Sequence, residues 1–205
     1  MIDLADQLKA IHREVGEGPS DTVGLLLRRT YDAAAEDVWD AVTDPARLRR
    51  WFLPVSGDLR EGGHFEVEGN ASGDILTCSP PKLLRVTYGG ETSVVELRLT
   101  ADDAERTTVE LEHTVPKAVA GSGAGALYVG PGWDGALLGL ALHLAGEVLE
   151  GDDPVAAANA PEVQRFNLGS VDAWTAAVEA SGTATEEELA AAVAVARGQY
   201  APDVV

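Results

Sequence analysis

Four histidines are the side chains of this sequence that could accept or release a proton near neutral pH. Strand-like alternation with Val109 and Leu111 places His113 on the apolar face of its segment. There it could exchange a proton with a bound molecule. We favour a hydrogen-bonded core histidine instead, because the sequence places no Asp, Glu or Ser to orient the ring. His113 is therefore only a weak catalytic candidate, and no catalytic residue is assigned.

The remaining histidines and the acidic pairs do not form a metal site in the sequence pattern. His64 falls on the polar face of its segment, His12 on a surface helix, and His143 on the flank of a long helix, as an interface residue. No two histidines have the i, i+4 spacing of a helical metal site. Asp102-Asp103 and Asp152-Asp153 lie in turns, where solvation accounts for them. We predict no bound metal.

Large aromatic residues are the best candidates for contact with a ligand. Trp51 and Phe52 follow Arg49 and Arg50 at the end of a short helix, where they could stack on a planar molecule. They could also be core residues, which we favour because large aromatics usually contribute buried area. The candidate ligand-binding set comprises Trp51, Phe52, Phe65, Tyr88, His113, Trp133, Leu137 and Leu140.

Composition limits the classes of partner. The chain of 205 residues has 34 acidic and 15 basic side chains, a formal charge of -19 that would repel nucleic acid and anionic membranes. Cys78 is the single cysteine, which excludes an internal disulfide framework and favours a cytoplasmic location. The N-terminus does not have the pattern of a signal peptide. The run GSGAG lacks the lysine of a phosphate-binding loop, so no cofactor is predicted.

Hydrophobic periodicity gives the order of elements. Leu4, Leu8, Ile11 and Val15 have helical spacing, which predicts a helix over the first fifteen or so residues. A strand follows at 22–31, and then two short helices. From residue 57 to 113, turn residues recur at intervals of about ten residues, which predicts about six antiparallel strands with one polar and one apolar face. Thr87 falls on the polar face.

The segment from Gly132 to Leu149 predicts a long helix that is apolar on two sides. This segment has roughly the minimum apolar length of a membrane span. Because it contains Asp134, His143 and Glu147, a buried helix is the better interpretation. One stripe would face the sheet and comprises Trp133, Leu137, Leu140, Leu144 and Val148. The opposite stripe comprises Leu138, Leu142, Ala145 and Leu149. It needs a cover, either from two C-terminal helices at 171–180 and 185–200, or from a partner subunit.

Four stretches carry a resemblance to a known superfamily: RRTYDAAAEDVWDAVTDPARLRRWFLPVSGDLREGGHFEVEG, ILTCSPPKLLRVTY, TTVELEHT and GPGWDGALLGLALHL. From about Thr22 to about Leu149 the chain resembles the START-like, helix-grip (SRPBCC) superfamily of polyketide cyclases, dehydrases and lipid-transport proteins. Within it, the chain is similar to the branch of homologues of the activator of the heat-shock-protein-90 ATPase.

The resemblance implies an α+β helix-grip fold, in which a curved antiparallel sheet wraps around a long C-terminal helix with extra helices at both termini. It also implies a cavity between sheet and helix. We divide the chain into an N-terminal helix at 1–20, the START-like domain at 21–150, and a helical C-terminal extension at 151–205. The extension would pack on the domain or on a partner subunit.

Three functions agree with these observations. Binding of a small hydrophobic molecule ranks first, because the chain offers apolar walls and no convincing catalytic set. A co-chaperone that contacts a heat-shock-protein ATPase ranks second, by analogy with the family name. A cyclase or dehydrase ranks third, so we favour a protein that is not an enzyme. The partners expected are the hydrophobic ligand, a chaperone or another protein, and a second copy in a homodimer.

Overall fold

The computed structural model describes residues 3–147 and 160–203. Its elements in chain order are α1 (Leu4–Lys9), β1 (His12–Gly18), β2 (Thr22–Tyr31), α2 (Ala35–Thr43), α3 (Pro45–Leu48), β3 (Val55–Gly57), β4 (His64–Val67), β5 (Ala71–Ser79), β6 (Leu83–Thr87), β7 (Val94–Asp103), β8 (Arg106–Pro116), α4 (Lys117–Ala120), the 3-10 helix η1 (Gly123–Gly125), α5 (Ala126–Leu144), α7 (Pro161–Ser181) and α8 (Glu186–Tyr200). Within these residues no helix is both long and apolar enough to cross a membrane.

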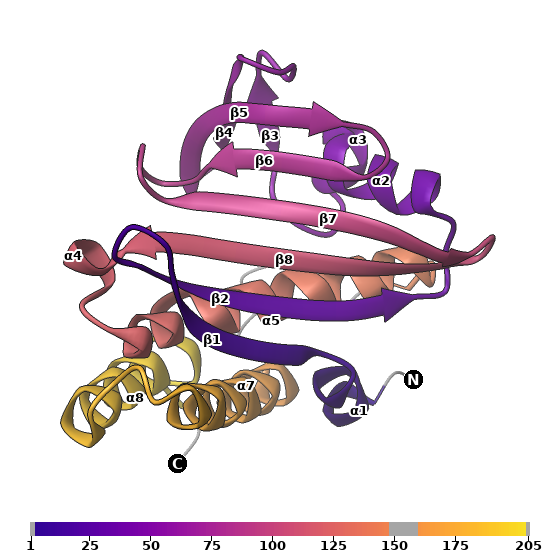
Figure 1. The fold of residues 1–205 in the computed structure, drawn as a ribbon. Helices are drawn as coiled ribbons and strands as arrows, with labels where there is room; N and C mark the ends of the chain where they lie inside the picture. The colour runs from indigo at the N-terminus through magenta and orange to yellow at the C-terminus, as the bar shows by residue number, and fades with distance from the viewer. Residues whose placement is uncertain (1–2, 148–159, 204–205) are drawn as a thin grey trace.

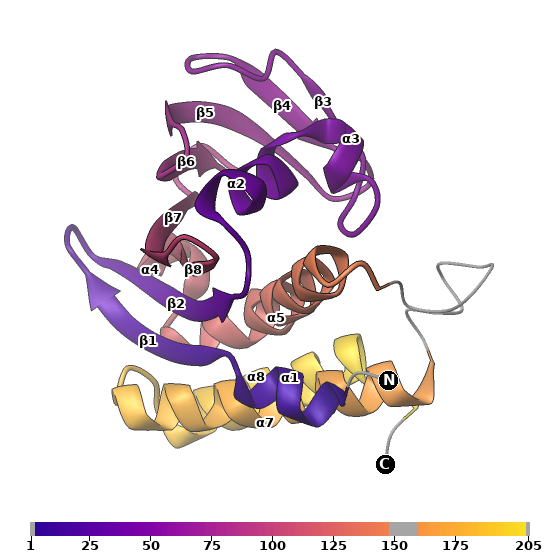
Figure 2. The same ribbon diagram turned by 90° about the vertical axis from the view of Figure 1, so that its right-hand side faces the viewer.

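The eight strands of the described residues join one antiparallel sheet, in the order β1-β2-β8-β7-β6-β5-β4-β3. The sheet is strongly curved, and α5 lies along its concave side (Figures 1 and 2). Helices α2 and α3 also lie on the concave side, at the end of the sheet where β3 is placed. The predicted α+β helix-grip fold is confirmed, including the six strands between residues 55 and 116.

The N-terminal segment differs from the prediction of one helix through Val15. Asp3 caps α1, which ends at Lys9, and β1 then pairs with the outer edge of β2. The apolar residues at 4, 8, 11 and 15 suit a helical face, but an uncovered β2 would leave a row of unpaired backbone groups at the sheet edge. Pairing of β1 satisfies these groups. His12 consequently lies on a strand and not on a surface helix.

Helix α5 begins at Ala126 and not at Gly132 as predicted. The stretch before Gly132 contains glycine and Pro131, which usually interrupt helices. Both Leu127 and Pro131 are fully buried, however, and burial of this extra length overrides the weak local preference. The described helix ends at Leu144, and the predicted helical positions Val148 and Leu149 lie outside the described residues.

The side of α5 that points away from the sheet is covered by helices of the same chain. Leu138 and Leu142, from the predicted second stripe, pack with Phe166 of α7 and with Leu4 and Leu8 of α1. Figure 2 shows α5 between the concave sheet and the pair α7 and α8. Helix α7 is longer than the predicted 171–180, whereas α8 begins with the predicted capping box of Thr185 and Glu188. The division of the chain into three regions stays a prediction.

A buried ion pair joins β1, α5 and α7. Arg13 Nε donates to both carboxylate oxygens of Asp134, at 2.9 and 3.1 Å, and neither side chain is more than 8% exposed. Ser170 Oγ also donates to Asp134, as does Trp174 Nε1 at 3.1 Å. Burial raises the pKa of the Asp134 carboxyl, while Arg13 and these donors favour its charged form. The carboxylate is therefore fully hydrogen-bonded.

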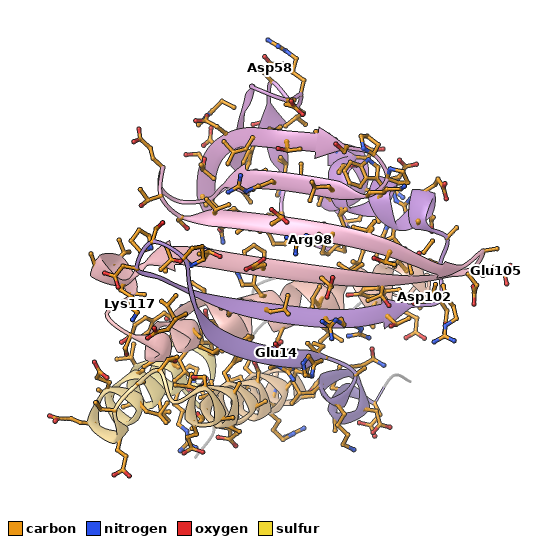
Figure 3. The ribbon with its side chains drawn as sticks, in the orientation of Figure 1. Glu14, Asp58, Arg98, Asp102, Glu105 and Lys117 are labelled. Carbon is orange, nitrogen blue, oxygen red and sulfur yellow. The ribbon has the colours of Figure 1, made fainter. Side chains whose placement is uncertain are left out.

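Charged residues alternate with apolar ones along the strands, and their side chains lie on the convex face of the sheet. Figure 3 shows the labelled Glu14 and Arg98 on strands of this outer side. Arg98 forms ion pairs with Glu96 and Glu112 of β7 and β8. This face is solvated, so ligand-sized apolar space must be sought on the concave side.

Thr87 is an exception to the predicted alternation, because it is buried and not exposed. Strand β5 approaches it closely: Thr87 Oγ1 accepts from the backbone N–H of Asp74 at 2.7 Å. A Cβ at Gly73 would lie only 1.8 Å from the Thr87 carbonyl oxygen, so glycine is required for this approach. The register of β5 against β6 also shifts between Ile75 and Thr77, which helps the sheet to curve.

Candidate functional site

An inner pocket of about 190 Å³ lies between the concave face of the sheet and α5. Its walls come from the apolar positions of β4 to β8, from the α2–α3 corner and from one side of α5. They comprise Val42, Thr43, Leu48, Trp51, Phe52, Val55, Leu59, Phe65, Val67, Ile75, Cys78, Leu84, Val86, Tyr88, Val95, Leu97, Val109, Leu111, Trp133, Ala136, Leu137 and Leu140.

Local sequence explains how the aromatic walls reach this pocket. Asp44 caps α3 and Pro45 occupies its first turn, so the chain turns sharply and directs Trp51 and Phe52 toward α5. The approach is tight, because a Cβ at Gly139 would lie 2.7 Å from the Trp51 carbonyl oxygen. A glycine at this turn of α5 thus lets the α3 corner close against the helix.

The polar atoms of the aromatic lining already have partners inside the protein. Trp51 Nε1 donates to the Ala41 carbonyl oxygen at 3.0 Å. The Tyr88 hydroxyl donates to Asn70 Oδ1 at 2.6 Å, and burial raises the pKa of Tyr88 to about 12. These rings therefore present their apolar faces to the pocket and do not need a ligand to satisfy their hydrogen bonds.

A second hollow, the outer groove, has a volume of about 520 Å³ and shares the walls formed by Phe52, Tyr88 and Trp133 with the inner pocket. It is bounded by the ends of β2 and β8, by α4, by the first turns of α5 and by the end of α8. Val119 and Tyr128, which are 72% and 42% exposed, also line it. The two hollows thus adjoin at these aromatic side chains, and the inner pocket is lined almost wholly by apolar groups whereas the outer groove is larger and more polar.

His113 lines the outer groove and lies behind the aromatic wall. Its ring is 5.9 Å from that of Trp133 and 6.4 Å from that of Tyr88. Trp133 Nε1 donates to His113 Nδ1 at 3.1 Å, and Ser93 Oγ lies 2.8 Å from Nε2. The expectation that no serine orients this histidine was therefore wrong. Ser93 lies two residues before Val95, the partner of His113 in the sheet, so both side chains share one face.

The Ser93–His113 pair has the spacing of a nucleophile and its base, but the opposite hydrogen-bond direction. An indole N–H can only donate, so Nδ1 of His113 must accept and the ring proton of the neutral form lies on Nε2. A base for Ser93 would need a free lone pair on Nε2. Burial also lowers the pKa of His113 to about 4. The ring is therefore neutral and is a poor proton acceptor at neutral pH.

Seven of the eight predicted ligand-binding residues meet at the inner pocket, and His113 alone of this set faces only the outer groove. The further apolar lining could have been found from strand alternation, which marks Val95, Leu97, Val109 and Leu111. The groove residues Asn70, Ser93, Val119, Tyr128 and Tyr200 were missed. They come from separate loops and helix ends, for which the sequence contains no local signal.

The other histidines lie away from both hollows. His64 is exposed and 2.7 Å from Asp74, as its polar-face position predicts. His143 Nε2 accepts from Arg47 Nε at 3.3 Å, and its pKa is lowered chiefly by burial and also by the nearby Arg47 and Arg50. In the part of the chain that the structure describes, no cluster of three His, Cys, Asp or Glu side chains could hold a metal ion.

Sequence comparison decides the family. The family of activator of Hsp90 ATPase homolog 1-like proteins matches residues 32–145, which is more than half of the chain and contains every strand from β3 to β8 together with α5. The chain belongs to this family. The match covers the inner pocket, whereas β1, α7 and α8 lie outside it. No curated protein matches the chain.

Solved structures extend the comparison to a larger share of the chain. The crystal structure of CalU16 from Micromonospora echinospora is 37% identical with a TM-score of 0.67, and the match covers 82% of this chain and 98% of CalU16. The solution structure of CalU16 gives 38% and 0.68, with 83% and 96% covered. DynU16, from the dynemicin biosynthetic locus, is 26% identical with a TM-score of 0.52, over 63% of this chain and 49% of DynU16.

Proposed function

We propose that the protein binds a small hydrophobic molecule in the inner pocket, without a metal or cofactor. The observation that carries this proposal is an apolar hollow of about 190 Å³ beneath α5, lined almost wholly by aliphatic and aromatic side chains. An apolar cavity of roughly 150 Å³ is enough to hold benzene. The inner pocket therefore suits one or two fused rings, and the outer groove gives room for the rest of a longer molecule.

Two further observations support a small-molecule ligand. Leu59, which is 40% exposed, lies at the rim of the inner pocket, so the apolar lining extends to the surface. DynU16 belongs to a biosynthetic locus, where small organic molecules are made.

The direction of the Ser93–His113 hydrogen bond favours binding over a cyclase or dehydrase reaction that uses His113 as base. A homodimer and a cytoplasmic location stay predictions.

N-phenyl-1-naphthylamine, whose fluorescence rises in apolar surroundings, provides a direct test. Wild-type protein is expected to bind this probe in the inner pocket. The bound probe should shield Cys78, the sole cysteine, because Cys78 lines the same pocket. Ala136→Leu extends a side chain into the same pocket. Because overpacking costs roughly 1–3 kcal/mol, the dissociation constant should rise by about tenfold or more. Fluorescence titration measures the constant.

Ala190→Leu is the matched control, because it adds the same atoms at an exposed position of α8. It should leave probe affinity unchanged. Monobromobimane labelling of Cys78 should also slow when the probe is bound to wild-type protein, and less so in Ala136→Leu. Equal affinities in wild type and Ala136→Leu, or no fluorescence rise in wild type, would contradict binding in the inner pocket.

The family match supports a second candidate function, contact with a chaperone of the Hsp90 type. Its test is the ATPase rate of a purified Hsp90 with and without this protein. A rate that rises with added protein, and equally with Ala136→Leu, would support a role that does not use the pocket. An unchanged rate over the full titration would count against this candidate.

A further inference from the structure

Trp133, His113 and Ser93 form a hydrogen-bonded row whose direction is set by its first member. The indole N–H donates to His113 Nδ1, and the Nε2–H of the neutral ring then donates to Ser93 Oγ. The serine oxygen is thus an acceptor within the row. Its own hydroxyl hydrogen must point elsewhere, and it is polarised by the two hydrogen bonds behind it.

Ser93 is half-buried and lines the outer groove beside Tyr88 and Trp133, which also border the inner pocket. Among the described residues, no acceptor lies within hydrogen-bonding distance of its hydroxyl apart from the already committed imidazole. By contrast, the Tyr88 and Tyr200 hydroxyls donate to Asn70 and to the Tyr128 carbonyl oxygen. The outer groove therefore offers an oriented donor at Ser93, next to the aromatic side chains that it shares with the inner pocket.

We propose that the ligand carries a neutral carbonyl oxygen, which accepts the Ser93 hydroxyl hydrogen at the aromatic wall while its apolar body occupies the inner pocket. The inference rests on the proposed function and names its ligand class: a small hydrophobic ketone, ester or quinone. A carboxylate fits less well, because the neighbouring walls are apolar and the chain carries a net charge of -19.

A pair of probes that differ in one atom group isolates this hydrogen bond. In 2-acetylnaphthalene a carbonyl oxygen accepts, and in 2-isopropenylnaphthalene a methylene group of similar size replaces it. Calorimetry gives both dissociation constants for wild type and Ser93→Ala. Since one neutral hydrogen bond contributes a few-fold in affinity, the ketone-to-hydrocarbon affinity ratio should fall by about 3- to 10-fold in Ser93→Ala. Thr92→Ala removes an exposed hydroxyl of the same loop and should leave the ratio unchanged.

The hydrocarbon also reports on the integrity of the pocket, because it does not use the serine. If both probes bind and the ratio is the same in wild type and Ser93→Ala, the carbonyl inference is overturned while the proposed function stands. If neither probe binds wild-type protein, both are overturned.

A measurement that needs no variant tests the direction of the row. The ¹⁵N shifts of His113 in the ligand-free protein at pH 7 should show a neutral ring with its proton on Nε2 and a hydrogen-bonded, unprotonated Nδ1. A neutral ring protonated on Nδ1 would leave Nε2 as the acceptor and the Ser93 hydrogen directed at the histidine, which would overturn the inference.

Discussion

Helix α5 is packed on both of its long sides, and the two sides differ in how completely they are filled. Toward α7, Trp174 is fully buried, and Asp134 is matched by Arg13, Ser170 and Trp174. Toward the sheet, Leu137 and Leu140 border a hollow of about 190 Å³. One side thus buries a charge in solid packing, and the other keeps apolar space without a charge.

The comparison separates residues that hold the fold from those available to a ligand. Packed interiors rarely leave voids larger than a water molecule, so a hollow of this size is a feature that packing alone does not explain. The contacts of α5 with α7 stabilise the helix, so the side that faces the sheet does not have to be filled completely. Variants on the α7 side should therefore change stability and leave ligand affinity alone.

Asp134→Ala should break the filled side most severely. It leaves the Arg13 guanidinium, 8% exposed, without its counter-charge, which costs about 3–5 kcal/mol in the free energy of unfolding. Urea denaturation measures the loss. Asp172→Ala on α7 removes an exposed ion pair with Arg197 of α8 and should cost less than about 1 kcal/mol. Similar losses in both variants would show that the buried pair has no special role.

His113 should make the hollow side sensitive to acid. Its pKa is about 4 in the folded protein and roughly 6.5 when unfolded, so the unfolded chain binds more protons between these values. The contribution of His113 to the free energy of unfolding is fully present above pH 6.5. It is lost as the pH falls toward 4, by roughly 3 kcal/mol in all. Tyr88, the titratable neighbour of the ring, has its pKa raised to about 12 and does not ionise in this window.

The measurement is the free energy of unfolding between pH 4 and 7, for wild type and for His113→Gln, which has no group to titrate. The wild-type curve should fall more steeply with decreasing pH, since other carboxylates contribute equally to both proteins. Parallel curves would show that His113 is not held neutral by the fold.

Two glycines of α5 allow a smaller and more local comparison. A Cβ at Gly130 would lie 2.5 Å from the ring of Trp174, whereas a Cβ at Gly135 has no neighbour within 4 Å. Gly130→Ala should lower the melting temperature, at a cost of about 1–3 kcal/mol. Gly135→Ala should raise it, by up to about 1 kcal/mol, through helix propensity alone. A stabilised Gly130→Ala would mean that the α5–α7 side is not tightly filled.

The sheet and the long helix were predictable because they depend on local periodicity. Val109 and Leu111 alternate with polar neighbours on β8, and the capping box at Thr185 and Glu188 marks the start of α8. Strand β1 was not predictable in this way. Its residues read equally as a helix, and only the uncovered edge of β2 makes pairing the better solution.

Within the candidate site, the sequence by itself determined which residue types are present and which of them face inward. Period-two alternation and helical spacing depend on neighbours in the chain, so they identified Phe65, Leu137 and the placement of His113 on the inner face. Only the tertiary structure decided what these groups contact. Ser93, His113 and Trp133 are each separated by twenty residues in the chain. Their hydrogen bonds, and the direction of these bonds, are set only when α5 packs against the concave face of the sheet.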